Sequence, residues 1–244
     1  MRVTVAYDGT NYVGWQRQTT GVSVQQVLED AFVPLFKGTG LAPTLIGASR
    51  TDAGVHALGQ VASIRVPFAF PADAVHRALN VRLPADVRAL EVADAPSSFH
   101  ARYDARGKSY RYQIVTTRIL SPFDRAYAWH MPRPCDAALM RAAAPHLVGC
   151  HDFASFEGRD SALLDTTRTL TRIDVGDRPG TIVVEVHGDG FLRHMVRVVV
   201  GTLVDVGCGI RPVDWPAQAL RARDRRAAGQ TAPARGLTLV AVEY

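Results

Sequence analysis

The sequence predicts a mixed α/β fold of the α+β type, in which two ferredoxin-like halves share a mostly antiparallel central sheet. Segments rich in β-branched residues recur along the chain, and capped amphipathic segments with helical spacing lie between them. Both halves show this alternation, which is typical of split β-α-β units. We expect the helices to cover one face of the sheet and the other face to form a ligand cleft.

The first half, residues 1–105, is predicted to be an α/β domain with two helices. The segment 23–36 opens with a capping box, since Gln26 follows Ser23 by three residues, and its apolar residues lie on one helical stripe. The segment 71–82 begins with a proline, which suits a helix start. The predicted strands span residues 2–7, 44–49, 59–66 and 87–95.

The second half, residues 106–244, is predicted to be a second α/β domain with the same alternation. Its strands are expected at residues 108–117, 169–175, 181–188 and 237–244. Its helices are expected at residues 136–148, 191–207 and 214–226. Asp136 suits the cap of the first of these helices, and Gly207 suits the end of the second.

The charge balance favours a polyanionic partner without demonstrating one. The 244 residues contain 28 Lys and Arg against 23 Asp and Glu, a net charge of +5. All of this surplus lies in the second half, because the first half carries nine residues of each sign. Only two of the basic residues are lysines, so an arginine-rich surface set by genome composition is an equally good explanation.

The cysteine spacing and the length of the apolar segments indicate the cellular compartment of the protein. The three cysteines lie far apart and form no C-x-x-C pair, which argues against zinc or redox chemistry and fits a reduced cytosol. The first residues lack the long apolar core of a signal peptide, and no apolar stretch approaches the ~20 residues of a membrane span. We therefore expect a cytoplasmic protein with no membrane contact.

The densest polar cluster is SRTDAGVHALGQ, residues 49–60, in a predicted loop between two apolar strands. Arg50 lies two residues from Asp52 and would help to hold that carboxylate ionised, while Gly54 would let a substrate approach the backbone. The residues alone favour a plainer interpretation, in which Asp52 closes an Asx-type turn and His56 packs beneath the loop.

A resemblance to a known family favours the catalytic interpretation of Asp52 over the structural one. GASRTDAGVHALGQVA resembles the signature segment of the tRNA pseudouridine synthase A family, in which the aspartate is catalytic, and Asp52 occupies that position. Ser49 stands where the family usually has glycine, and Met195 where some members have glutamine. Four further segments resemble the family in the same order: YDGTNYVGWQRQ (7–18), FHARYDARGKSYRYQI (99–114), GDGFLRHMVRVVVGTLVDVG (188–207) and APARGLTLVAVEY (232–244).

The resemblance implies a function and roles for individual residues. It implies isomerisation of uridine to pseudouridine in the anticodon stem-loop of tRNA, at tRNA positions 38, 39 and 40, without a cofactor. Asp52 would be the nucleophile or base, Arg197 would pair with Asp52, and Tyr110 would stack on the target base. Arg50 would help to extrude the target nucleotide. Leu237 would form an apolar floor, although burial in the core is at least as good an explanation for it.

A group of basic residues is predicted to contact the RNA, without a separate role for each residue. Five basic residues with interleaved tyrosines suit phosphate contacts and stacking, although a solvated charged strand face is the default alternative. They are Arg17, Arg102, Arg106, Lys108 and Arg111. We expect His56 to contribute to substrate binding. A metal site is not expected, since no histidine near His56 has ligand spacing.

The resemblance also implies that the partner is tRNA, bound in the cleft, and that the protein is a homodimer. Two rival functions stay open. A non-catalytic RNA-binding module or RNA chaperone would keep the scaffold and lose turnover. An aspartyl-phosphoenzyme hydrolase would share a nucleophilic aspartate, but the sequence has no acidic pair for a metal near Asp52.

Overall fold

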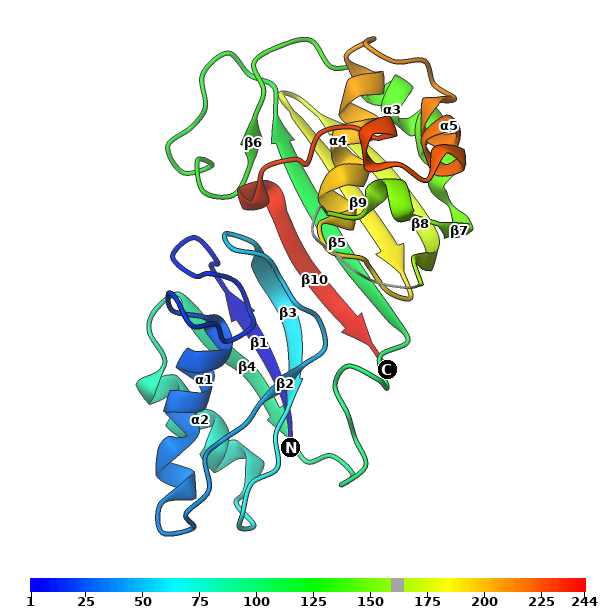
Figure 1. The fold of residues 1–244 in the computed structure, drawn as a ribbon. Coiled ribbons are helices and arrows are strands. Elements are labelled where there is room, and N and C mark those ends of the chain that lie inside the picture. The colour runs from blue at the N-terminus through cyan, green and yellow to red at the C-terminus, as the bar shows by residue number, and fades with distance from the viewer. Residues whose placement is uncertain (159–164) are drawn as a thin grey trace. The chain divides into compact units, whose positions relative to one another are not determined.

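The computed structural model describes residues 1–158 and 165–244, and its chain falls into two compact units (Figure 1). Unit 1 comprises Met1–Arg106 and Leu239–Tyr244, and unit 2 comprises Gly107–Thr238. The sequence had assigned all of 106–244 to the second half. The final residues join unit 1 instead, because the last strand pairs with a strand of that unit. No helix in the described segments is long and apolar enough to cross a membrane.

Unit 1 has the ferredoxin-like topology that the sequence predicts. Its elements follow one another as β1 (Arg2–Tyr7), α1 (Val24–Phe32), β2 (Ile46–Gly47), β3 (His56–Ser63), α2 (Ala72–Arg82) and β4 (Val87–Ala93). The strand order is β4-β1-β3, with β2 and the last strand, β10 (Leu237–Glu243), also pairing with β3. Strand β1 runs antiparallel to both neighbours, with Val3 opposite Ala62 and Val92.

The helices of unit 1 begin where the sequence predicts. The Ser23 hydroxyl accepts a hydrogen bond from the backbone N–H of Gln26 at 3.2 Å, as the capping box requires. Helix α1 gives way to a 3₁₀ turn at Val33–Phe36, which contains Pro34. On α2, the Asn80 side chain bonds both backbone groups of Ala89, at 2.8 and 3.1 Å, and so satisfies the edge of strand β4.

A buried polar network on α1 holds two loops in place. The Glu29 carboxylate accepts hydrogen bonds from Nε of Arg17 and Nε2 of Gln25, both at 2.9 Å, and from the backbone N–H of Leu45 at 3.1 Å. Gln25 also donates to the carbonyl of Leu45. Glu29 thereby ties the segments before β2 and before α1 to one helix.

Unit 2 is built around an antiparallel sheet. Its strands are β5 (Gly107–Val115), β6 (Trp129–His130), β7 (Gly149–Asp152), β8 (Thr167–Arg178) and β9 (Thr181–Gly188). The order is β5-β9-β8-β7, and the short β6 runs parallel beside β5. Tyr112 lies opposite Val184, which lies opposite Val175, and all three are buried. The sequence missed β6 and β7, which are too short to show periodicity.

Three helices lie on one side of the unit 2 sheet (Figure 1). They are α3 (Ala137–Ala143), α4 (Met195–Gly207) and α5 (Trp215–Ala222). The Asp136 carboxylate caps α3 as predicted, accepting from the backbone N–H of Ala138 at 2.7 Å. The prediction that α4 starts at residue 191 is wrong, because His194 adopts a left-handed conformation with φ of 61° and ends the turn that precedes the helix.

We predict that Glu29→Ala destabilises the protein by about 2–3 kcal/mol, because it leaves the buried N–H of Leu45 and the amide of Gln25 without their acceptor. Urea unfolding followed by circular dichroism measures the change. Asp73→Ala is the control, since Asp73 is an exposed acidic residue in the first turn of α2, outside this network. An unfolding free energy equal to that of the control would show that the network contributes nothing.

We predict a pH-dependent effect of Asp205→Asn. Burial raises the pKa of Asp205 on α4, against the influence of Arg133 and Arg211. Its contribution to stability is therefore fully present below the unfolded pKa of ~4 and is lost as the pH rises through the folded pKa. The melting temperature of the asparagine variant should exceed that of the wild type at pH 7 but not at pH 3. The exposed Asp177→Asn should show no such difference, and equal shifts at both pH values would contradict the prediction.

Candidate active site

The loop that carries Asp52 is fixed by its backbone to a neighbouring segment of unit 1. Asp52 forms an isolated antiparallel bridge with Gly14, and the backbone N–H of Trp15 donates to the carbonyl of Thr51 at 3.0 Å. Within the loop, the N–H of Val55 donates to the carbonyl of Asp52 at 3.1 Å. Asp52 itself is half-buried, so a residue whose backbone is fixed in this way remains partly accessible.

Gly14 is required for this contact. It has a φ of +108°, and a Cβ at this position would lie 2.5 Å from the carbonyl oxygen of Thr51. Any side chain would therefore push the Asp52 loop away. The segment YDGTNYVGWQRQ, which resembled the family in the sequence, thus supplies the support on which the loop rests.

Two buried side chains brace the loop further. Gln60 on β3 donates from Nε2 to the carbonyl of Ser49 at 2.8 Å and accepts from the N–H of Ser49 at 3.2 Å. The hydroxyls of Tyr7 and Thr51 lie 2.8 Å apart. Sequence reasoning did not identify Gln60 or Tyr7, although both fall inside segments that resemble the family.

His56 and Arg50 occupy different environments. His56 is the first residue of β3 rather than part of the loop, and it is buried. Its Nδ1 lies 3.1 Å from the backbone nitrogen of Gly9 and 3.1 Å from Oδ1 of Asp8. This position fits the packing alternative for His56. Arg50 is exposed at the entrance of the loop.

In unit 2, Arg197 is anchored to the segment that leads into Leu237. Arg197, in the first turn of α4, donates from Nε to the carbonyl of Ala232 at 2.7 Å, and its own carbonyl accepts from the N–H of Ala232. Leu237 follows in the same segment and is buried. Burial raises the pKa of the Tyr112 hydroxyl, and the charge of Arg197 opposes this shift.

Tyr110 faces the helices of unit 2. Its ring packs edge to face against Phe191, with centroids 5.1 Å apart, and only 5% of the residue is exposed. Tyr110 lies opposite Val186, which is also buried, on the face that the helices cover. The residues of the open face alternate with these along β5 and β9.

The turn before α4 is tightly packed. His194 adopts its left-handed conformation beside Gly158, where a Cβ would lie 2.5 Å from Nδ1 of His194. Such a conformation is uncommon outside glycine and persists only where the surroundings enforce it. The turn sets the direction of the first helical turn, which carries Arg197.

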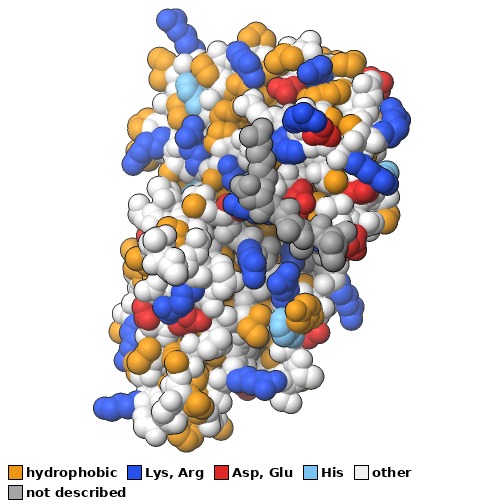
Figure 2. Space-filling model, in the orientation of Figure 1, with side chains coloured by type: hydrophobic (Ala, Val, Ile, Leu, Met, Phe, Trp, Pro, Cys, Tyr) orange, Lys and Arg blue, Asp and Glu red, His pale blue; other side chains and the backbone are white. Residues whose placement is uncertain are grey.

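The basic residues predicted to contact phosphate include some that form ion pairs with carboxylates and some for which no such ion pair is seen among the described residues. Arg17 pairs with the buried Glu29, and Arg111 pairs with Glu185, both at 2.8 Å. Arg102 and Arg106 are exposed, and Lys108 is half-buried. Figure 2 shows Lys and Arg side chains recurring over the face that it draws. The group therefore does not act as one uniform basic surface.

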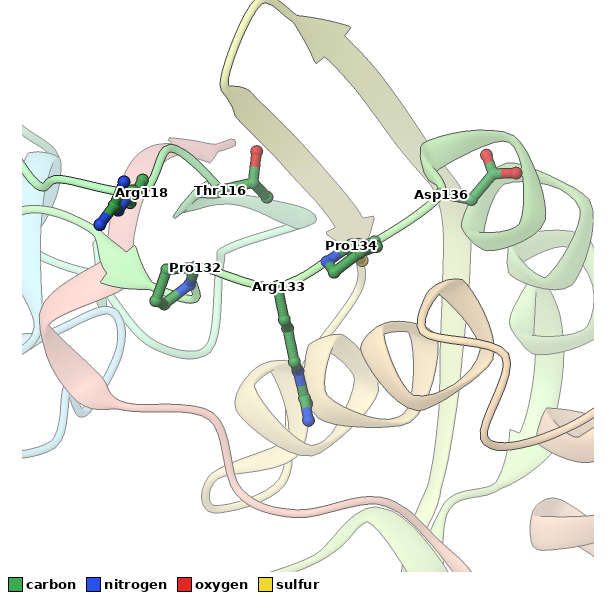
Figure 3. A pocket seen from close by; sticks show the side chains of 7 residues that line it. Thr116, Arg118, Pro132, Arg133, Pro134 and Asp136 are labelled. Atoms are coloured by element: carbon green, nitrogen blue, oxygen red, sulfur yellow. The ribbon is translucent and has the colours of Figure 1, made fainter.

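A shallow cavity of about 500 Å³ lies in unit 2, away from these residues along the chain. It is lined by Thr116, Arg118, Pro132, Arg133, Pro134, Cys135 and Asp136. Figure 3 shows the side chains of Arg118 and Arg133 pointing in different directions, so they do not converge on one anion. None of the predicted site residues lines this cavity.

One group of side chains on the open face of unit 2 has the spacing of metal ligands. The ligand atoms of Asp174, Glu185 and His187 lie within 4.8 Å of one another. All three side chains are paired with arginines. Arg172 contacts Asp174 at 2.7 Å and His187 at 2.9 Å, and Arg111 pairs with Glu185. The group is accordingly an ion-pair network, and independence from metal stays a prediction.

Comparison with known proteins identifies the family. The family model described as tRNA pseudouridine synthase matches residues 3–104 and 143–244. The chain is 45% identical over 244 residues to tRNA pseudouridine synthase A of Syntrophotalea carbinolica, covering 100% of this chain and 96% of that protein. It is 45% identical over 247 residues to the protein of that name from Moorella thermoacetica, covering 100% and 99%. For the one from Thermoanaerobacter sp. the identity is 43% over 242 residues, covering 99% and 98%. The chain belongs to the tRNA pseudouridine synthase family.

Proposed function

We propose that the protein isomerises uridine to pseudouridine in the anticodon stem-loop of tRNA, with Asp52 as the catalytic carboxylate. Membership of the family makes the protein an isomerase. One observation carries the assignment of Asp52. Its loop is held by backbone contacts to Gly14 and Trp15 and by the side chain of Gln60, while Asp52 remains half-buried. A rigid support under a partly exposed carboxylate suits a group that must meet a substrate atom.

The chemistry needs a positioned carboxylate and no co-substrate. The bond between N1 of uracil and C1′ of ribose breaks, and a bond between C5 and C1′ forms. C5 loses a proton and N1 gains one, so substrate and product are isomers. Asp52 acts as nucleophile or as base in this sequence. Attack at C1′, attack at C6 and removal of a sugar proton are all compatible with a carboxylate.

Arg197 is proposed to pair with Asp52 and to orient it. The hydrogen bond from Nε to Ala232 fixes one edge of the guanidinium, and the packed turn at His194 fixes the start of its helix. A guanidinium held in this way suits two parallel hydrogen bonds to a carboxylate. These restraints within unit 2 support the proposal.

Tyr110, Leu237 and Arg50 are proposed to receive the target nucleotide. Tyr110 would stack on the uracil, Leu237 would form an apolar floor, and the exposed Arg50 would fill the gap left in the RNA stack. The contact of Tyr110 with Phe191 and its burial hold the tyrosine ring in one orientation, which supports a role in positioning the base.

The remaining properties are proposed from the resemblance. We propose a cytoplasmic homodimer that needs neither a metal nor an organic cofactor. Sedimentation at the concentration used for the activity assay tests the dimer. Retention of activity after dialysis against a chelator tests the independence from metal.

We predict that Asp52→Ala lowers tritium release from tRNA transcribed with uridine labelled at C5 by at least about a thousandfold, because loss of the one group that acts as nucleophile or base costs this much. Binding of the tRNA should change less than about threefold. Asp73→Ala, at an exposed position on α2, is the control and should keep full activity. Release that persists in Asp52→Ala would refute the assignment. Binding by the wild type without any release would favour a non-catalytic RNA-binding module.

We predict that Arg197→Lys lowers kcat by about tenfold to a hundredfold and changes KM by less than about threefold. Lysine keeps the charge but loses the planar pair of donors that holds a carboxylate. Steady-state tritium release measures both constants, with Arg193→Lys, an exposed arginine in the preceding turn, as control. A rise in KM at unchanged kcat would show that Arg197 binds RNA instead of orienting Asp52.

A further inference from the structure

The turn between His100 and Asp104 in unit 1 is unusually well fixed for an exposed segment. Nδ1 of His100 accepts hydrogen bonds from the backbone N–H groups of Arg102 and Tyr103, at 3.2 and 3.1 Å. The Asp104 carboxylate accepts from the N–H of His100 at 2.9 Å, and the N–H of Asp104 donates back to the His100 carbonyl at 3.1 Å. These four hydrogen bonds hold the turn in one conformation.

This turn displays an aromatic ring to solvent. Tyr103 is 77% exposed, yet its ring stacks on His100 with centroids 4.2 Å apart and an angle of 25° between the planes. The guanidinium carbon of Arg102 lies 6.0 Å from the centre of the same ring. The ring is thus held in place without being buried. A fixed aromatic face beside an arginine is the arrangement that receives an unpaired nucleotide.

The charges around the ring also fit an anionic partner. Arg102 and Arg106 are exposed, and neither forms an ion pair with a carboxylate within the described parts of the chain. Arg17 and Arg111, from the same predicted basic group, are neutralised by Glu29 and Glu185. Arg102 is therefore the member of the group that combines exposure with an adjoining exposed ring.

We propose that Tyr103 is a stacking platform for an unpaired base of the RNA substrate, and that Arg102 meets the adjoining phosphate. This proposal rests on the proposed function and adds a second aromatic contact. The platform is distinct from Tyr110, which is only 5% exposed. A base can stack on Tyr103 without any rearrangement of the protein, so the contact contributes to binding of the RNA rather than to the bond-breaking step.

The test is binding of a transcribed tRNA by the full-length protein at fixed salt concentration. Loss of one stacked base weakens binding by about tenfold or more, so Tyr103→Ala should raise Kd by that factor. Tyr103→Phe keeps the ring and should bind as the wild type does. Tyr103→Leu keeps apolar bulk without the ring and should behave like Tyr103→Ala. Phe123→Ala is the matched control, since Phe123 is an aromatic residue of unit 2 that is 84% exposed, and its Kd should not change.

Activity and assembly complete the test. The kcat of Tyr103→Ala at saturating tRNA should match that of the wild type, while KM rises together with Kd. Unchanged binding by Tyr103→Ala, or wild-type binding by Tyr103→Leu, would overturn the platform. A change of oligomeric state of Tyr103→Ala in sedimentation would also overturn it and would assign the ring to contact with a second copy. Absence of tritium release by the wild type would refute the proposed function, whereas normal release with unchanged binding by Tyr103→Ala refutes only this inference.

Discussion

The contact between two backbones in unit 1 is the constraint on which the candidate site depends. Gly14 bridges to Asp52 with no room for a side chain, and Trp15 donates to the carbonyl of Thr51. Backbone hydrogen bonds between buried segments are short and directional, so they fix the loop more closely than side-chain packing would. Gln60 closes the other end of the loop through both backbone groups of Ser49. Asp52 lies within this fixed segment and is only half-buried.

In unit 2, a turn with an uncommon backbone conformation orients the candidate site residues. Arg197 lies among apolar residues in the first turns of α4, and its direction depends on the turn at His194, which adopts a conformation that is costly for a residue with a side chain. Phe191, in the same turn, packs against Tyr110. A single turn therefore supports both an arginine and an aromatic ring. We infer that these two contacts offset the cost of the left-handed conformation of His194.

The positive charge of the chain is less available to RNA than its net value implies. Arg17 and Arg111 have carboxylate partners, and the ion pairs on the open face of unit 2 neutralise Arg172 as well. Exposed pairs of this kind contribute little to stability, but they reduce the local potential. We therefore expect contacts with RNA to depend on individual exposed positions such as Arg102 and not on a broad basic surface.

The sequence by itself determined the fold class, the ferredoxin-like order of unit 1 and the position of most helices and strands. Periodicity and capping residues such as Ser23 and Asp136 act locally, so they can be interpreted without a structure. The resemblance supplied Asp52, Arg197 and Tyr110 as candidates. Only the tertiary structure decided which neighbours support them.

The contacts that support the site could not be predicted from the sequence because they join segments distant in the chain. Gln60 is a polar residue in a strand, and nothing in its own segment shows that its amide bonds a loop eleven residues earlier. The exposure of Tyr103 and the burial of Tyr110 follow from which strand face and which turn each residue occupies. The start of α4 depends on His194 packing beside Gly158, a contact between segments distant in sequence. Such long-range contacts leave no periodic signal, because they are set by packing between elements and not by the spacing of residues within one.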